Sequence, residues 1–88
     1  MNFKISLGPL ALEHIQALKK AGDKVALKKI AILVDELTKH PFTGTGKPEP
    51  LRHNLSGLWS RRINQKHRLI YRVEEDTVYI QSVKGHYS

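Results

Sequence analysis

The segment from Arg68 to Val73 alternates between two kinds of side chain, and this alternation constrains the fold more than any other feature. Leu69, Tyr71 and Val73 occupy one set of positions, and the other set begins with Arg68 and ends with Arg72. Successive side chains of a strand point to opposite faces of its sheet. The pattern therefore predicts a strand with one face on a core and one basic face left uncovered.

Three further strands are predicted around this one. Asn2–Ser6 alternates in the same way at the start of the chain. Leu58–Ile63 and Thr77–Lys84 flank the central candidate, His67–Glu74, and the separators "NQK" and "ED" are short enough to be hairpin turns. Between residues 41 and 57, "PFTGTGKPEP" predicts a loop that its prolines stiffen.

Two helices are predicted between the first strand and this loop. The first covers Leu10–Lys20, with Pro9 at a permitted first-turn position. Asp23 can cap a second helix that stops near His40, before Pro41. One face of the second helix is apolar at the spacing typical of an amphipathic helix, at Leu27, Ile30, Val34 and Leu37.

This element order predicts an α+β fold: an antiparallel meander with an N-terminal strand and a helical hairpin packed on one face. The 88 residues are enough for a single domain, residues 1–88. The chain has no cysteine, and its longest apolar run, "IAILV", is far too short to span a bilayer. Its beginning also lacks a signal-peptide pattern, so we expect a soluble cytoplasmic protein.

The positive charge is confined to one stretch. Eight lysines and arginines and one acid lie between Lys39 and Arg72, which accounts for the whole net charge of +7. A confined basic patch is typical of a surface that binds a polyanion, and nucleic acid is favoured over a basic face that only aids solubility. An anionic membrane is less favoured because the cations lie in strand-like sequence. The candidate RNA-binding cations of the loop and the following strand are Lys47, Arg52, Arg61 and Arg62.

The predicted three-residue turn also fixes a pairing of two arginines. If "NQK" is the turn, Ile63 pairs with His67 and Arg62 lies directly across from Arg68. Two cations so placed repel each other, and a phosphate between them would relieve the repulsion. The alternative is that both long side chains extend separately into water.

Glu49 is the only carboxylate in the basic stretch. If the surface cleaves RNA without a metal, a base must take the 2′-hydroxyl proton and an acid must protonate the leaving oxygen. Glu49 is the only acidic residue there that can serve as the base; alternatively it is an ion-pair partner for the surrounding cations. At the C-terminus, His86 is a candidate acid because an unperturbed imidazole changes its charge near neutral pH, and Tyr87 can stack on a base. The five histidines have no metal-ligand spacing, so no metal site is predicted.

The long pattern "GKPEPL.HNL.G.WSRRI...HRL.Y", followed by a terminal "HY", resembles the YoeB/Txe toxins of the RelE/ParE superfamily. The resemblance implies the RelE-like microbial RNase fold and a metal-independent, cofactor-free endonuclease that cuts mRNA in the ribosomal A site. It also implies a YefM/Phd-type antitoxin as partner and a homodimer or a toxin–antitoxin complex as the assembly.

The resemblance further implies roles for individual residues. Glu49 matches the family's general base, Arg68 the arginine that stabilises the transition state, His86 the general acid and Tyr87 the terminal tyrosine that orients the substrate. Two more residues, His53 and Arg62, match accessory phosphate-binding positions. The usual family ending Arg-Tyr-His-Tyr is replaced here by Lys84-Gly85-His86-Tyr87. Two alternatives stay open: a ParE-like toxin that inhibits gyrase without cutting RNA, and a basic RNA-binding module.

Overall fold

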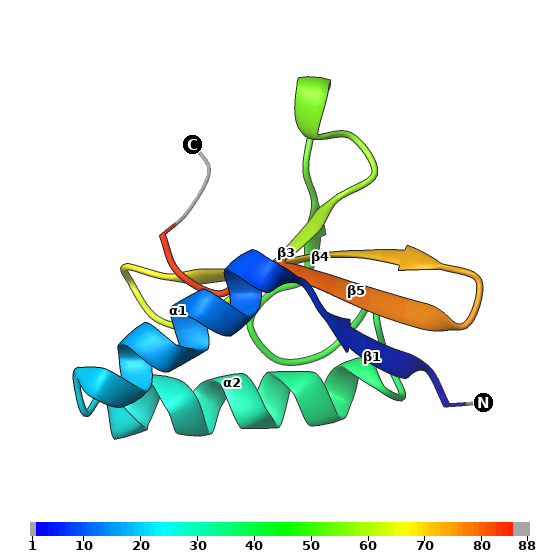
Figure 1. Cartoon of the computed structure of the whole chain (residues 1–88). Coiled ribbons are helices and arrows are strands. Elements are labelled where there is room, and N and C mark those ends of the chain that lie inside the picture. Colours follow the sequence, from blue (N-terminus) through cyan, green and yellow to red (C-terminus); the bar gives the residue numbers. More distant parts are fainter. Residues whose placement is uncertain (1, 86–88) are drawn as a thin grey trace.

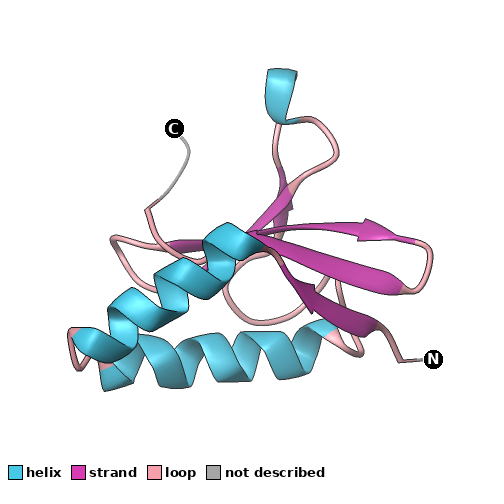
Figure 2. Cartoon of the chain, viewed as in Figure 1, coloured by secondary structure: helices cyan, strands magenta, loops and turns pink. Residues whose placement is uncertain are grey.

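Two consecutive helices cover one face of a five-stranded sheet (Figures 1 and 2). The computed structural model describes residues 2–85. Its elements are β1 (Lys4–Leu7), α1 (Pro9–Lys20), α2 (Lys24–Leu37), β2 (Glu49–Pro50), the short 3₁₀ helix η1 (His53–Leu55), β3 (Trp59–Arg62), β4 (Arg68–Glu74) and β5 (Thr77–Ser82). Neither α1 nor α2 is long and apolar enough to cross a membrane.

The strand order is β1-β5-β4-β3-β2. The predicted antiparallel meander is confirmed as β3, β4 and β5, and the α+β class is confirmed with it. Two features of the sheet were not predicted. β1 pairs with β5 in parallel, because the two helices carry the chain back before the meander begins, and β2 adds a two-residue edge strand within the predicted loop.

Both helices begin as the sequence predicts. Pro9 is the first residue of α1 and follows Gly8, whose backbone is extended. Lys19 and Lys20 lie in the last turn, where a positive charge interacts favourably with the negative end of the helix dipole. The side chain of Asp23 caps α2, its Oδ1 accepting from the N–H of Ala26 over 3.1 Å. α2 ends at Leu37, three residues before the expected stop.

The core lies between the helices and the covered face of the sheet. Leu33 and Leu37 of α2 are fully buried, as are Leu69 and Tyr71 of β4 and Val78 of β5. The predicted apolar face of α2 is rotated slightly, so that its buried positions are Ala26, Ile30, Leu33 and Leu37, whereas Leu27 and Val34 are half-buried at its border. Within residues 2–85, α1 and α2 both lie on this covered face, so the other face of the sheet is left without them, as the alternation in β4 predicts.

Candidate active site

The exposed carboxylate of Glu49 lies at one end of a row of residues that crosses the sheet. Glu49 is opposite Ser60, Ser60 is opposite Ile70, and Ile70 is opposite Ser82. Ser60, Ile70 and Ser82 are nearly inaccessible to solvent, although Ile70 is outside the core cluster under the helices. The face of the sheet without helices therefore has a short line of nearly buried residues, and the Glu49 carboxylate lies at the end of this line.

The loop before Glu49 holds the carboxylate at this edge. The N–H of Arg62 donates to the carbonyl of Gly46 over 2.7 Å, and the N–H of Leu51 donates to the carbonyl of Leu58 over 2.8 Å. Pro48 and Pro50 have no N–H, which confines β2 to an edge position and keeps it short. Lys47 has a φ of 50°, so the chain turns sharply just before Pro48.

Arg62 and Arg68 are register partners on the same open face, which confirms the predicted pairing. The N–H of Ile63 donates to the carbonyl of His67 over 3.0 Å and closes the turn between the strands. Arg62 is exposed, whereas Arg68 is half-buried and its Nη1 donates to the carbonyl of Asn64 over 3.2 Å. Arg62 and Arg68 lie two residues along their strands from Ser60 and Ile70, the next positions on the same face, so two cations and the carboxylate share one surface.

The chain leaving β5 comes back to this pair. The backbone N–H of Arg68 donates to the carbonyl of Gly85 over 2.8 Å. Gly85 is the last described residue, and His86 and Tyr87 of the predicted site lie outside the described residues. The residue directly before His86 is thus bonded to the backbone of the predicted transition-state arginine.

Arg61 is a correction to the predicted RNA-binding set. Its side chain is fully buried and lies on the core face, because side chains alternate along β3 and Arg62 takes the open face. The guanidinium donates five hydrogen bonds. The acceptors are Tyr71 Oη, Glu36 Oε1 and the carbonyl oxygens of His40, Thr43 and Thr45. Arg61 therefore organises the loop that precedes Glu49 and does not reach a ligand on the open face.

Two ionisable groups that contact Arg61, Glu36 and Tyr71, have shifted pKa values. Hydrogen bonds from the side chain and N–H of Thr45 are the main cause that holds the pKa of Glu36 below its usual value. Burial opposes this shift, and the charge and hydrogen bond of Arg61 add smaller effects that lower the pKa further. Burial raises the pKa of Tyr71, although the hydrogen bond and charge of Arg61 oppose the shift. Tyr71 in turn donates from its hydroxyl to the carbonyl of Pro41 over 2.5 Å.

The other residues predicted to bind RNA on this side of the chain are at the surface. Lys47, Arg52 and His53 are exposed, with His53 opening η1 at a φ of 60°. Figure 1 shows η1 at the tip of a loop that projects away from the two helices. Among residues 2–85, no group of three or more His, Cys, Asp or Glu side chains is arranged to hold a metal ion.

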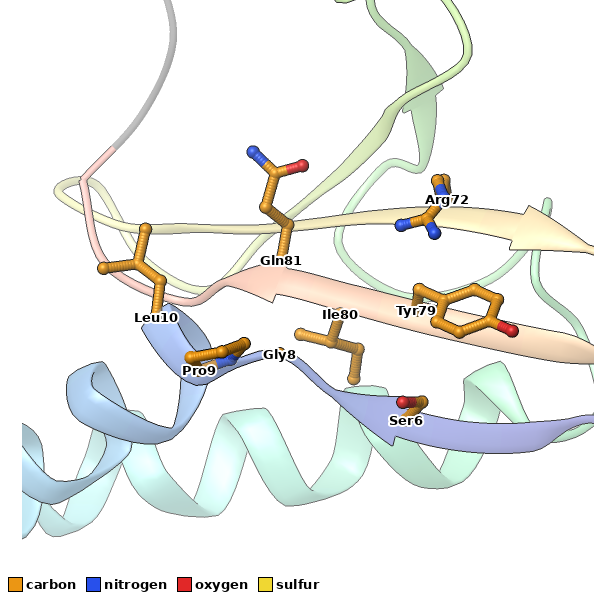
Figure 3. Close-up of a pocket in the computed structure, with 8 residues that line it drawn as sticks. All are labelled: Ser6, Gly8, Pro9, Leu10, Arg72, Tyr79, Ile80 and Gln81. Atoms are coloured by element: carbon orange, nitrogen blue, oxygen red, sulfur yellow. The ribbon is translucent and has the colours of Figure 1, made fainter.

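A separate pocket of about 250 Å³ lies at the β1 side of the sheet, beside the start of α1 (Figure 3). Its lining residues are Ser6, Gly8, Pro9, Leu10, Arg72, Tyr79, Ile80 and Gln81. The guanidinium of Arg72 lies 4.3 Å from the centre of the Tyr79 ring and its Nε bonds to Glu74 over 2.8 Å. This pocket contains none of the residues predicted to do chemistry.

The sequence interpretation missed two histidines that contact the chain after β5. His67 Nδ1 accepts from the N–H of Gly85 over 2.9 Å, and His14 Nδ1, on α1, accepts from the N–H of Val83 over 3.3 Å. His14 is half-buried on α1. No local pattern signals such contacts, because the partners are 18 and 69 residues apart in the chain.

Comparison with known proteins adds independent evidence. Residues 11–87 match the model of the YoeB-like toxin of bacterial type II toxin–antitoxin systems. Toxin YoeB of Escherichia coli K12 is 52% identical over 65 residues, which cover 74% of this chain and 77% of the relative. Toxin YoeB of Synechocystis is 51% identical over 66 residues, 75% of this chain and 77% of the relative.

Solved structures agree with this match. The YoeB/ParE toxin from Agrobacterium tumefaciens superposes with a TM-score of 0.91 at 31% identity, over 97% of this chain and all of that one. The YoeB dimer from Staphylococcus aureus gives 0.87 at 39% identity, over 99% of this chain and all of that one. Fold and sequence together define the class as the toxin of a type II toxin–antitoxin system. Within that class, the chain belongs to the YoeB-like toxin family.

Proposed function

We propose that this chain is an endoribonuclease that cuts mRNA in the A site of translating ribosomes by general acid–base chemistry, without a metal or cofactor. The observation that supports this most is the bond between the Arg68 N–H and the Gly85 carbonyl. It ties the residue before the proposed acid, His86, to β4, a strand of the same sheet whose edge strand β2 carries the proposed base, Glu49.

The reaction balances with these groups alone. Glu49 takes the proton of a 2′-hydroxyl, and the resulting oxygen attacks the neighbouring phosphorus. The bond from phosphorus to the 5′-oxygen breaks, and His86 donates a proton to that oxygen, leaving a cyclic phosphate and a free 5′-hydroxyl. Arg68 and Arg62 stabilise the negative charge that gathers on the phosphate oxygens. Tyr87 orients the substrate, and Lys47, Arg52 and His53 bind the RNA backbone.

The open geometry of this surface fits a nuclease that relies on the ribosome. Glu49 and Arg62 are exposed on the same face of the sheet, so the domain does not enclose its substrate. An mRNA held in the A site is already oriented by the ribosome. The ribosome then supplies the orientation that a closed active site otherwise provides. Translating ribosomes are in the cytoplasm, so this role implies a cytoplasmic location. We also propose that residues 1–88 form a single domain.

We also propose a YefM/Phd-type antitoxin as the partner and a dimer as an accessible state. A YoeB–YefM complex and a YoeB dimer are known for Staphylococcus aureus relatives that are 38% and 39% identical to this chain. Several large apolar side chains are exposed and available to such partners, namely Leu7, Leu10, Leu12, Val25, Ile32 and Phe42.

Primer extension on an mRNA translated in a reconstituted system tests the activity. We expect breaks inside codons that require both translation and this chain, and that disappear with Glu49→Gln. Breaks that persist with Glu49→Gln would contradict the assigned chemistry. Absence of breaks, with loss of gyrase supercoiling activity instead, would favour the ParE-like alternative.

A further inference from the structure

The imidazole of His67 holds the chain end that leads to the proposed acid. Its Nδ1 accepts from the N–H of Gly85 over 2.9 Å, and the N–H of the next residue, Arg68, donates to the Gly85 carbonyl over 2.8 Å. Both backbone polar groups of Gly85 are therefore bound by two consecutive residues at the start of β4.

This contact depends on the protonation state of His67. An imidazole accepts at Nδ1 only when it is neutral with its proton on Nε2, whereas an imidazolium carries N–H groups at both positions. Protonation of His67 would place two N–H groups against each other and release Gly85. The contact is therefore present only in the neutral form.

The groups around His67 favour that neutral form. Partial burial is the main cause that lowers the pKa of His67, and the positive charge of Lys84 is the next. Lys66 on its own turn and His14 on α1 act in the same direction, and Asp23 at the start of α2 acts against them. Loss of the contact is thus expected below the ordinary histidine range, as the pH falls through the lowered pKa.

Gly85 also has a conformation that needs this support. Its φ is +74°, in the left-handed region, and nothing lies within 4 Å of the position that a Cβ would take. Glycine loses more conformational freedom on ordering than any other residue. Without the bonds from His67 and Arg68, little in its surroundings would select one direction for the chain.

We propose that His67 is a positioning residue: its neutral side chain fixes the backbone of Gly85, from which the chain continues to the proposed acid, His86. This inference rests on the proposed function for the role of His86. It adds that a second histidine holds the residue before the acid, and that this hold depends on pH.

Two substitutions separate hydrogen bonding from mere bulk. His67→Asn places an amide oxygen close to the position of Nδ1, where it can accept from Gly85 and cannot be protonated. His67→Gln places its amide at the position of Nε2 and leaves the Gly85 N–H without this acceptor. His40→Asn is the matched control, because its side chain is exposed and only its backbone carbonyl contacts Arg61.

The first measurement is hydrogen exchange of the Gly85 amide in the free protein between pH 5 and 8. We expect protection in the parent and in His67→Asn near pH 8, loss in His67→Gln at every pH, and selective loss in the parent as the pH falls. The ratio of parent to His67→Asn at each pH removes the intrinsic effect of pH on exchange. Equal protection in His67→Gln and the parent would overturn the proposal.

The second measurement is single-turnover cleavage of ribosome-bound mRNA. We expect His67→Gln to lower the rate at saturation by about 10²-fold with little change in KM, as for a displaced catalytic group. His67→Asn should stay within about threefold of the parent and lose its acid-side pH dependence, and His40→Asn should match the parent. An unchanged rate in His67→Gln refutes the positioning role. A parent that never cuts refutes the proposed function, while Gly85 exchange still tests the contact separately.

Discussion

Arg62 and Arg68 face each other across β3 and β4 on the open side of the sheet, one exposed and the other half-buried. Their guanidinium groups belong to a surface with two cations and one carboxylate, Glu49, within two rows of residues. Two like charges at opposed strand positions destabilise a sheet. An anion bound between the two guanidinium groups would offset this repulsion. In the proposed function, that anion is a phosphate of the RNA backbone.

Replacement of Arg62 by glutamine should therefore raise the stability of the free protein and weaken its binding to RNA. We expect a gain of about 0.2–1 kcal/mol in the free energy of unfolding at low ionic strength, which disappears as salt screens the repulsion. The slope of log affinity against log salt should fall by about one. Urea unfolding at two salt concentrations and an RNA-binding titration measure these effects. Arg52→Gln, in the exposed loop, should change the slope but give no gain in stability.

Replacement of Glu49 by glutamine should abolish cleavage and leave the fold intact. The carboxylate is exposed on an edge strand, and the glutamine amide keeps its size and its strand pairing with Ser60. Loss of a general base lowers the rate of the chemical step by about 10²–10⁴-fold. Single-turnover cleavage, with thermal unfolding as the check on folding, makes the comparison. Glu13→Gln, an exposed change on α1, is the matched control and should cut like the parent.

The network around Arg61 predicts a stability defect of a different size. Removing the guanidinium by Arg61→Ala leaves Glu36 and three loop carbonyls without their buried partner, which for a buried ion pair costs about 3–5 kcal/mol. Arg61→Lys keeps the charge but supplies three donors in place of five, so it should also destabilise clearly. Urea unfolding measures both variants. A loss no larger than that of Arg62→Ala would show that the network carries little stability.

Arg61 also shows how far the sequence could predict this site. Alternation in β4 correctly placed Leu69 and Tyr71 in the core, and the turn length correctly paired Arg62 with Arg68. The same alternation in β3 puts Arg61 on the face of Trp59, opposite to Arg62. A count of charges treats both arginines alike, and so it predicted a surface role for a buried side chain.

The remaining differences arise from contacts between distant parts of the chain. The parallel pairing of β1 with β5 depends on where the helical hairpin returns the chain, which local patterns do not encode. β2 forms because Gly46 bonds to Arg62 of β3 and Leu51 to Leu58 just before β3, and not because its two residues favour a strand. The contact between His67 and Gly85 likewise exists only once β4 and the end of β5 are side by side.

Gly46 should be intolerant of any side chain. Its φ is +84°, and a Cβ there would lie 2.8 Å from the carbonyl oxygen and 3.1 Å from the nitrogen of Arg62. Gly46→Ala therefore combines left-handed strain of about 1–2 kcal/mol with a backbone clash beside Glu49. Gly22→Ala is the control, because its φ of +71° carries similar strain with nothing within 4 Å. We expect Gly46→Ala to lose clearly more stability in urea unfolding, and to lower cleavage as well, whereas equal losses would contradict the clash.

Glu36 should govern part of the acid sensitivity of the fold. Its pKa is lowered in the folded protein by the side chain and N–H of Thr45 and by Arg61, so the unfolded chain binds a proton at a higher pH than the folded one does. Stability contributed by Glu36 is then fully present above its ordinary pKa of 4.5 and is lost as the pH falls through the lowered folded value.

Replacement of Glu36 by glutamine should flatten this dependence. The amide oxygen can still accept from the N–H of Thr45, which is 2.8 Å from the carboxylate, but it no longer carries the charge that pairs with Arg61. We expect lower stability than the parent at pH 7 and a smaller further loss between pH 5 and 3. Urea unfolding at pH 7, 5, 4 and 3 measures this, with Glu13→Gln as the exposed control. An acid limb as steep in Glu36→Gln as in the parent would assign the acid sensitivity to other carboxylates.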